Sequence, residues 1–143
     1  MTIHLGCPRL SEDPAAMKAV KDEVVSVTFA RSAGLLMSAV GPNHYAVGDA
    51  LITGSTGDRW SVTRDRFEAK YRPCDGQMPG ADGRYRNVPV LIWAKQMHSP
   101  FTIERCTGGD RLSGLAGDWA VEYAENDCGL VAQDRFAAVY RQA

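Results

Sequence analysis

The chain has 143 residues, 23% of them charged and 45% hydrophobic, a balance typical of a folded globular protein rather than a disordered or membrane-embedded one. Sixteen basic and seventeen acidic residues give a formal net charge of −1, so no overall positive field would attract nucleic acid or an anionic membrane. The start lacks the features of a secretory signal, and no apolar run has the roughly 18 residues of a membrane span. We therefore expect a cytoplasmic protein that binds neither nucleic acid nor membrane.

Residues 1–22 form an extension with a pattern typical of a helix start. Asp13 can serve as an N-cap, and Pro14 suits the first helical position. Lys18 and Lys21 would favour the negative end of the helix dipole. We therefore predict a short helix in this N-terminal extension.

The rest of the chain contains an internal repeat. Residues 48–72 align without a gap with residues 117–141 at an offset of 69, and 10 of the 25 positions are identical. Unrelated segments would share about one or two. Upstream the match is weaker, and its offset falls to 66 and then to 64, as expected where insertions lie in loops. We predict two copies of one unit, at 23–73 and 87–143, joined by a Pro- and Gly-rich linker at 74–86.

Each copy begins with alternating apolar residues, a period that predicts a strand with one buried face. In the first copy these are Val25, Val27 and Phe29, and the alignment places Val24 over Val88 and residues 35–40 over 101–106. The predicted strands of the first copy continue with 35–40, 51–53 and 60–62, and those of the second copy are the segment with Val90, Ile92 and Ala94, then 101–106, 120–123 and 129–131.

Both copies close with the sequence D-R-F-x-A-x-Y-R, which predicts a short helix. Phe67 and Tyr71 are four residues apart, as are Phe136 and Tyr140, so each pair lies on one helix face and is expected in the core. Thr63 can cap the first helix, whereas the second copy has an alanine there and is expected to begin less sharply.

These elements predict the α+β class, with two tandem, mainly antiparallel β lobes that each end in a short helix. A unit of about 50 residues buries little surface alone, so we expect the lobes to pack together. A duplicated chain inherits the self-complementary geometry of a homodimer, which predicts a pseudo-two-fold pair.

The repeated motifs resemble the PGDYG family of bacterial and phage proteins. The likeness rests on GDALITG at residues 48–54 and GDWAVEY at residues 117–123, each followed by the F-x-x-x-Y of its helix. The family pattern has a proline before Gly-Asp, where this chain has Val47 and Ala116. The resemblance covers most of the chain and implies a phage or prophage context, but no settled activity.

Five residues are candidates for ligand binding: Asp49, Asp118, Arg66, Arg135 and Trp119. The two acids could be catalytic, but a turn carboxylate bonded to backbone or to the repeated arginines is the competing interpretation. The arginines could line a groove for an anionic ligand, or be solvated or paired within the chain. Trp119 could stack on a ligand or pack in the core.

No combination of residues indicates a metal site, a cofactor or a catalytic triad. Cys7, Cys74, Cys106 and Cys128 are far apart and lack C-x-x-C spacing, so reduced thiols are expected. The three histidines occupy no equivalent positions in the two copies, and none lies in a recognisable nucleophile motif.

We expect a non-catalytic binding module, monomeric or homodimeric, whose ligand is a protein or small molecule seated between the lobes, because loops of a duplicated scaffold carry recognition. One alternative is an inhibitor or toxin-neutralising protein, which an exposed acidic or aromatic patch would favour. Another is a small hydrolase or transferase that uses Asp49 or Asp118, and that activity requires such an acid in a cleft beside a second titrating group.

Overall fold

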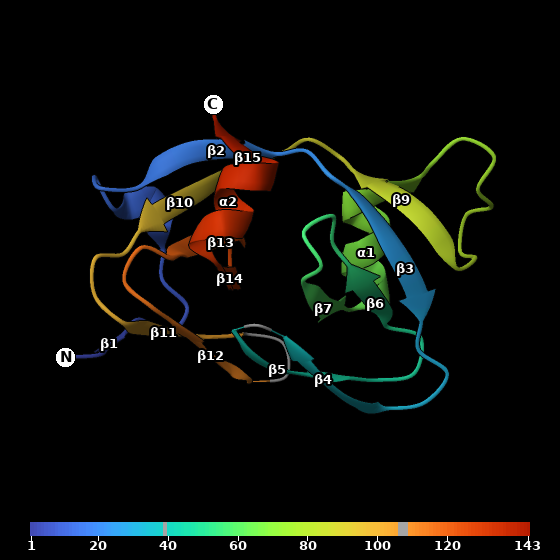
Figure 1. Ribbon diagram of the computed structural model, residues 1–143, viewed down its shortest axis with the longest axis horizontal. Helices are drawn as coiled ribbons and strands as arrows, with labels where there is room; N and C mark the ends of the chain where they lie inside the picture. The colour runs from blue at the N-terminus through green and yellow to red at the C-terminus, as the bar shows by residue number, and fades with distance from the viewer. Residues whose placement is uncertain (39, 106–108) are drawn as a thin grey trace. The chain divides into compact units, whose positions relative to one another are not determined.

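The computed structural model describes residues 1–38, 40–105 and 109–143, which form two compact units (Figure 1). Unit 1 consists of Met1–Lys21, Val40–Pro42 and Val90–Ala143, and unit 2 of Asp22–Ala39 and Asn43–Pro89. In unit 2 the elements are β3 (Val24–Phe29), β4 (Gly34–Ser38), β5 (Gly41–Tyr45, beginning in the short stretch assigned to unit 1), β6 (Ala50–Thr53), β7 (Arg59–Val62), α1 (Arg64–Lys70), β8 (Tyr71–Pro73) and β9 (Gly83–Asn87). In unit 1 they are β1 (Ile3–His4), the 3-10 helix η1 (Leu10–Glu12), β2 (Met17–Lys21), β10 (Leu91–Gln96), β11 (Phe101–Glu104), β12 (Arg111–Gly114), β13 (Trp119–Ala124), β14 (Asp127–Val131), α2 (Gln133–Val139) and β15 (Tyr140–Gln142).

Each unit is built on a five-stranded antiparallel sheet, and both sheets have the same order of strands. The order is β7-β6-β3-β9-β8 in unit 2 and β14-β13-β10-β2-β15 in unit 1. The short helices occupy matching places, since α1 joins β7 to β8 and α2 joins β14 to β15. A two-stranded β4-β5 sheet and a three-stranded β1-β11-β12 sheet complete the pairing. Many antiparallel strands with two short helices agree with the predicted α+β class.

The fourth strand of each sheet comes from a part of the chain outside the aligned segments. β9 lies in the predicted linker except for its last residue, Asn87, which begins the predicted second copy, and it pairs with β3 and β8. β2 lies in the N-terminal extension and pairs with β10 and β15 (Figure 1). In the chain, however, β2 directly precedes β3 and β9 directly precedes β10. β2 is therefore part of the unit 1 sheet although the next strand, β3, is in unit 2, and β9 is part of the unit 2 sheet although the next strand, β10, is in unit 1.

The predicted N-terminal helix is wrong. Asp13 accepts the backbone N–H of Ala15 at 2.8 Å and forms a turn, but the chain then continues as β2 and not as a helix. Ala19, at the centre of β2, is 0% exposed and lies opposite Ile92 of β10. Helix propensity is a weak local preference, and the ladders on both edges of β2 override it.

The strand register corrects the alignment of the repeats. Val27 lies opposite Ile52, and in unit 1 Ala94 lies opposite Val121, so β3 and β10 correspond at an offset of 67 rather than 64. Val24 therefore corresponds to Leu91 and not to Val88. The predicted strand with Val90, Ile92 and Ala94 begins one residue later, at Leu91, and Val90 itself is exposed. A shift of three residues moves every side chain to the opposite face of a strand, so it was the alignment by residue similarity, and not the apolar alternation, that misplaced the register.

The helix aromatics lie in equivalent environments, as predicted. Phe67 stacks on Tyr71 with ring centroids 5.0 Å apart, and Phe136 stacks on Tyr140 at 4.8 Å. All four side chains are buried, and each pair lies in the core cluster of its own unit. The four-residue spacing thus positions one aromatic stack against each sheet.

Large and small residues change places between the two units at matched cross-strand positions. In unit 2 the ring of Tyr45 lies against Gly34, whereas in unit 1 the ring of Phe101 lies against Gly114. Gly34, the first residue of β4, thus corresponds to Phe101, the first residue of β11. Their offset is 67, not the 66 of the sequence alignment. A second cross-strand pair shows the same exchange. In unit 2, Phe29 lies opposite Ala50 and packs on Phe67. In unit 1 the large residue is on the other strand, where Trp119 lies opposite Gln96 and packs on Phe136. In the first of these exchanges the combined side-chain volume of the pair is nearly kept, since Gly34 with Tyr45 is replaced by Phe101 with Gly114.

Candidate functional site

The two repeated aspartates are bonded to backbone, which confirms the turn interpretation. Asp49 Oδ2 accepts the N–H of Ala46 at 2.9 Å, and Asp118 Oδ2 accepts the N–H of Leu115 at 2.9 Å. The glycine before each of them has a positive φ, +90° at Gly48 and +100° at Gly117, which only glycine adopts without strain. These carboxylates close the turns that lead into β6 and β13.

Asp118 has a second role at the start of α2. Its Oδ1 accepts the N–H of Gln133, the first residue of that helix, at 2.9 Å. Thr63, by contrast, makes no side-chain capping hydrogen bond at the start of α1. The prediction that Thr63 caps its helix is therefore wrong, and the second helix obtains from a distant turn the acceptor that its own N-cap lacks.

Replacing Asp118 by Ala is expected to destabilise the protein more than replacing Asp49 by Ala. Asp118 accepts two of the backbone N–H groups described above, and Asp49 accepts one. With about 1 kcal/mol for each lost acceptor, we expect losses of about 2 and about 1 kcal/mol in the free energy of unfolding. Urea denaturation of both variants checks this order, and equal losses would contradict the second role of Asp118.

Three of the candidate residues, Asp118, Trp119 and Arg135, lie at α2 of unit 1. Arg66 is partly exposed on α1, whereas Arg135 on α2 is 7% exposed. Trp119 stacks on Phe136 with ring centroids 3.8 Å apart, which supports the core-packing interpretation. Asp118 and Trp119 thus make contacts within unit 1, while Asp49 and Arg66 belong to unit 2.

Tyr123 in unit 1 has an altered acidity. Burial raises its pKa above the ordinary value of 10.0, against the opposing effects of a hydrogen bond with Tyr140 and of the charges of Arg135 and Arg105. Its ring lies against Gly129, which stands where the first repeat has Trp60. The phenol is thus protonated at neutral pH, and its ring fills the space above a glycine.

Metal-binding clusters are absent from the part of the chain that the structure describes, where no three His, Cys, Asp or Glu side chains gather. Cys7, Cys74 and Cys128 are thiols rather than disulfides, and Cys128 donates to the carbonyl of Pro8 at 3.4 Å. Cys106 lies outside the described residues.

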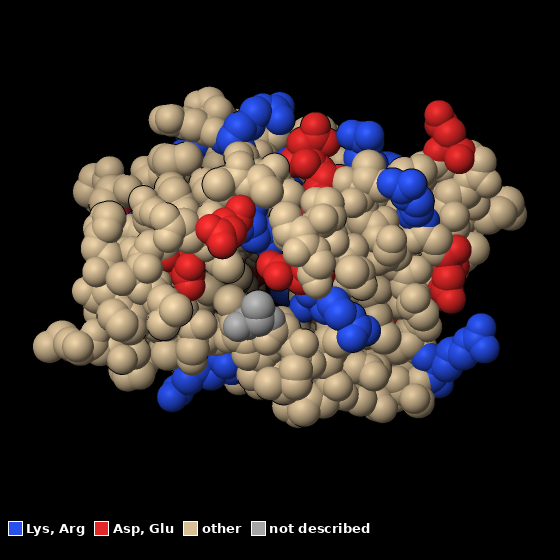
Figure 2. All heavy atoms as spheres, viewed as in Figure 1, with Lys and Arg blue, Asp and Glu red and all other residues tan. Residues whose placement is uncertain are grey.

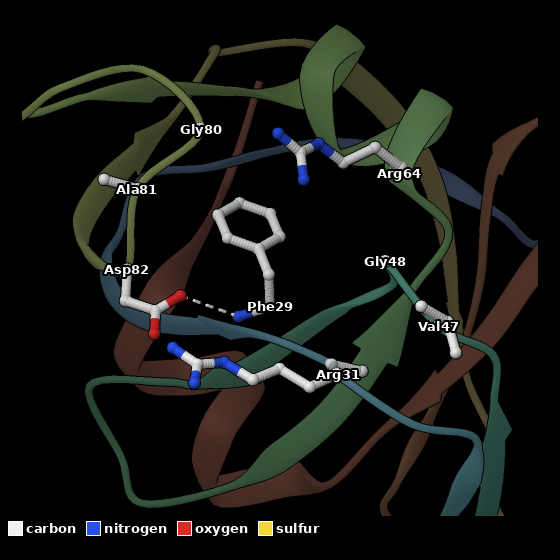
Figure 3. A pocket seen from close by; sticks show the side chains of 9 residues that line it. Phe29, Arg31, Val47, Gly48, Arg64, Gly80, Ala81 and Asp82 are labelled. Carbon is white, nitrogen blue, oxygen red and sulfur yellow. Dashed lines mark hydrogen bonds between the residues drawn. The ribbon is translucent and has the colours of Figure 1, made fainter.

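A shallow hollow lies on unit 2 (Figure 3). Its lining comes from the end of β3, the turn before Asp49, the first residue of α1 and the loop before β9. We call it the unit 2 hollow, and it is lined by Phe29, Ala30, Arg31, Val47, Gly48, Arg64, Gly80, Ala81 and Asp82.

The hollow combines an aromatic ring with two guanidinium groups. The guanidinium of Arg64 lies 4.1 Å from the ring centroid of Phe29, and its Nε donates to Glu68 at 3.0 Å. Asp82 accepts the backbone N–H of Phe29 at 2.9 Å, which fixes the loop against β3. Arg31 is exposed and extends along the rim (Figure 3). This arrangement suits an acidic group next to an apolar surface.

Sequence reasoning missed this hollow because its residues are not repeated. Arg64 is replaced by Gln133 in the second copy, and the loop with Asp82 was assigned to the linker. The closely spaced glycines of this loop indicate that its backbone approaches another element closely, but they do not indicate which strand the loop contacts. On the face shown in Figure 2, acidic and basic side chains are scattered among uncharged ones.

Residues 41–141 match the model of a family described as PGDYG protein. No curated protein and no solved structure matches the chain. Among the described residues, no helix has the length and apolar character to cross a membrane.

Proposed function

We propose that this chain, a member of the PGDYG family by the match over residues 41–141, is a non-catalytic binding module whose ligand is an acidic segment of another protein. The observation that carries the proposal is the unit 2 hollow, whose lining combines the exposed Arg31 with the Phe29 ring, the Arg64 guanidinium and the Asp82 carboxylate (Figure 3). A guanidinium at the rim of an apolar surface can pair with a carboxylate while the ring contacts its aliphatic part.

The environment of the repeated acids supports a binding role over hydrolysis. Asp49 and Asp118 both use carboxylate oxygens to hold turns, and Asp118 also holds the start of α2. A general acid or base needs a carboxylate directed at a substrate, and these are directed at their own backbone.

The shape of the hollow supports a protein ligand over a small metabolite. Pockets that bind small molecules are deep enough to bury most of the ligand surface. The unit 2 hollow is open and formed largely by a turn and a loop, with Val47 at its rim 68% exposed. An open surface of this kind fits side chains presented by another protein.

We also infer that the two units are copies of one ancestral unit that exchange a strand. Equal strand order, equal register and the exchange of large and small residues at matched positions support this inference. The connections between β2 and β3 and between β9 and β10 favour the exchange, because neither contains glycine and the second contains Pro89. Tight hairpin turns prefer glycine, so these connections disfavour pairing of consecutive strands.

Replacing Arg31 by Glu is expected to abolish partner binding while the fold is kept. The charge reversal would repel an acidic ligand, and an exposed side chain contributes little to stability. The matched control is Arg59→Glu, an equally exposed arginine on β7 outside the hollow. Affinity copurification from the native host followed by mass spectrometry checks both variants. We expect one stoichiometric protein that wild type and Arg59→Glu retain and Arg31→Glu loses at least about tenfold. Equal retention by all three, or a bound metabolite in place of a protein, would contradict the proposal.

A further inference from the structure

The hairpin formed by β4 and β5 lies in a long uncharged stretch. Residues 32–48 contain no Asp, Glu, Lys or Arg, although 23% of the chain is charged, so about four such residues would be expected by proportion. Leu35 and Met37 on β4 are nevertheless 51% and 64% exposed. Exposed strands are ordinarily protected by charges or proline, and β4 has neither.

The equivalent edge of unit 1 is covered by another strand. β1 pairs in parallel with β11, with Ile3 opposite Phe101 and His4 opposite Thr102. The carbonyl of Thr102 accepts the N–H of Leu5 at 3.1 Å, and its hydroxyl is 2.8 Å from His4 Nδ1. Thr102 is 7% exposed as a result. This edge of the unit is therefore one at which the fold accepts an added strand.

Leu35 and Met37 occupy on β4 the positions of Thr102 and Glu104 on β11. The correspondence follows from the glycine contacts, which match Gly34 on β4 with Phe101 on β11. The backbone of Thr102 bonds with β1, on the side of β11 that faces away from β12. At the corresponding position of β4, the backbone N–H and C=O groups of Leu35 therefore point away from β5. Among the described residues, β4 has β5 as its one strand partner, so its outer edge presents unpaired backbone groups and two apolar side chains.

Within the described part of unit 2, no further strand pairs with this edge. In unit 1 the covering strand precedes β2, and the matching stretch of unit 2 is the short connection between β8 and β9. That connection is held elsewhere, because the Tyr85 hydroxyl donates to the carbonyl of Ala81 at 2.7 Å and accepts the N–H of Gly80 at 3.0 Å. The occupant must therefore come from another molecule.

We propose that β4 pairs in antiparallel fashion with β4 of a second copy of this chain. In a two-fold arrangement centred on Leu36, Leu35 of one copy lies opposite Met37 of the other, so each exposed apolar side chain is covered by an apolar neighbour. No like charges meet, because the strand and its flanking residues 32–48 are uncharged. The net charge of −1 adds little repulsion between copies. The contact is closed by symmetry and gives a dimer rather than a fibre.

Sedimentation velocity of the full chain over a wide range of concentrations tests this dimer. The interface is small, so we expect a reversible monomer–dimer equilibrium typical of transient contacts. The Leu35→Lys variant is expected to raise the dimer dissociation constant at least about tenfold, because it places two lysines at the new interface. The matched control is Leu91→Lys, since Leu91 has a similar exposure of 55% on β10 in unit 1. A monomer at every concentration, or equal weakening by both substitutions, would overturn the proposal.

Hydrogen exchange distinguishes strand pairing from a contact made by side chains alone. We expect exchange of the Leu35 and Met37 amides to slow as the protein concentration rises, with the Leu35→Lys variant showing no such change. Dimerisation without protection of these two amides would overturn the strand pairing. These measurements do not involve the unit 2 hollow. A monomeric protein would contradict the dimer but not the proposed binding role, and partner binding unaffected by Arg31→Glu would contradict the binding role but not the dimer.

Discussion

Replacing Ala19 by Asp is expected to lower the free energy of unfolding by roughly 3–5 kcal/mol. Ala19 is 0% exposed on β2, between Ile92 of β10 and Gln142 of β15. A carboxylate there would be buried without a partner, among the apolar side chains of the unit 1 core. The loss would be this large only if β2 is an interior strand, because on an exposed helix the same substitution costs little.

Lys18→Asp is the control for Ala19→Asp. Lys18 is the preceding residue of β2, is exposed, and contacts the Trp93 ring at 5.5 Å. Losing this cation–π contact should cost no more than about 1 kcal/mol. Guanidinium denaturation of both variants, monitored by far-UV circular dichroism, measures the difference. Similar small losses for the two substitutions would contradict the interior position of β2.

Replacing Phe67 or Phe136 by Ala is expected to cost about 3–5 kcal/mol in each case. The Phe67 ring contacts Tyr71, Phe29 and Tyr85. Phe136 lies between the rings of Trp119 and Tyr140, with centroids 3.8 Å and 4.8 Å away. Both substitutions remove the central ring of an aromatic cluster and leave a cavity, so the losses should be similar.

Glu68→Ala provides the comparison for the Phe67 variant. Glu68 is exposed on α1 and pairs with Arg64 four residues earlier. Such a pair contributes about 0.3–0.5 kcal/mol, so this variant should remain close to wild type. Thermal and urea denaturation check all three variants. A loss for Phe136→Ala much smaller than for Phe67→Ala would show that the two helices do not play equivalent parts.

Local spacing was sufficient to predict the features that depend on neighbouring residues. The four-residue spacing of Phe67 and Tyr71 predicts their shared face, and Gly-Asp predicts a turn whose carboxylate binds nearby backbone. The structure confirms both, because each depends on contacts within a few residues. The class of the fold followed from the same short patterns.

These local patterns could not predict which distant strands pair with one another. The residues Met17–Lys21 have partners about 70 and 120 positions away in the chain, and their local sequence favours a helix start. The register of β10 was misplaced by three residues because the alignment followed residue similarity, although an odd shift places every side chain on the opposite face of the strand. The unit 2 hollow joins a loop and a strand separated by more than 50 residues, so no motif marks it.

Nuclear Overhauser effects between strand backbones test the central claim, that β2 completes the sheet of unit 1, most directly. The structure predicts cross-strand effects between Ala19 and Ile92 and between Ala19 and Gln142, with none between Val20 and Val24. Effects between Val20 and Val24 would mean that β2 forms a hairpin with β3. That result, or sequential helical effects across Met17–Lys21, would contradict the strand exchange on which the account of the two units rests.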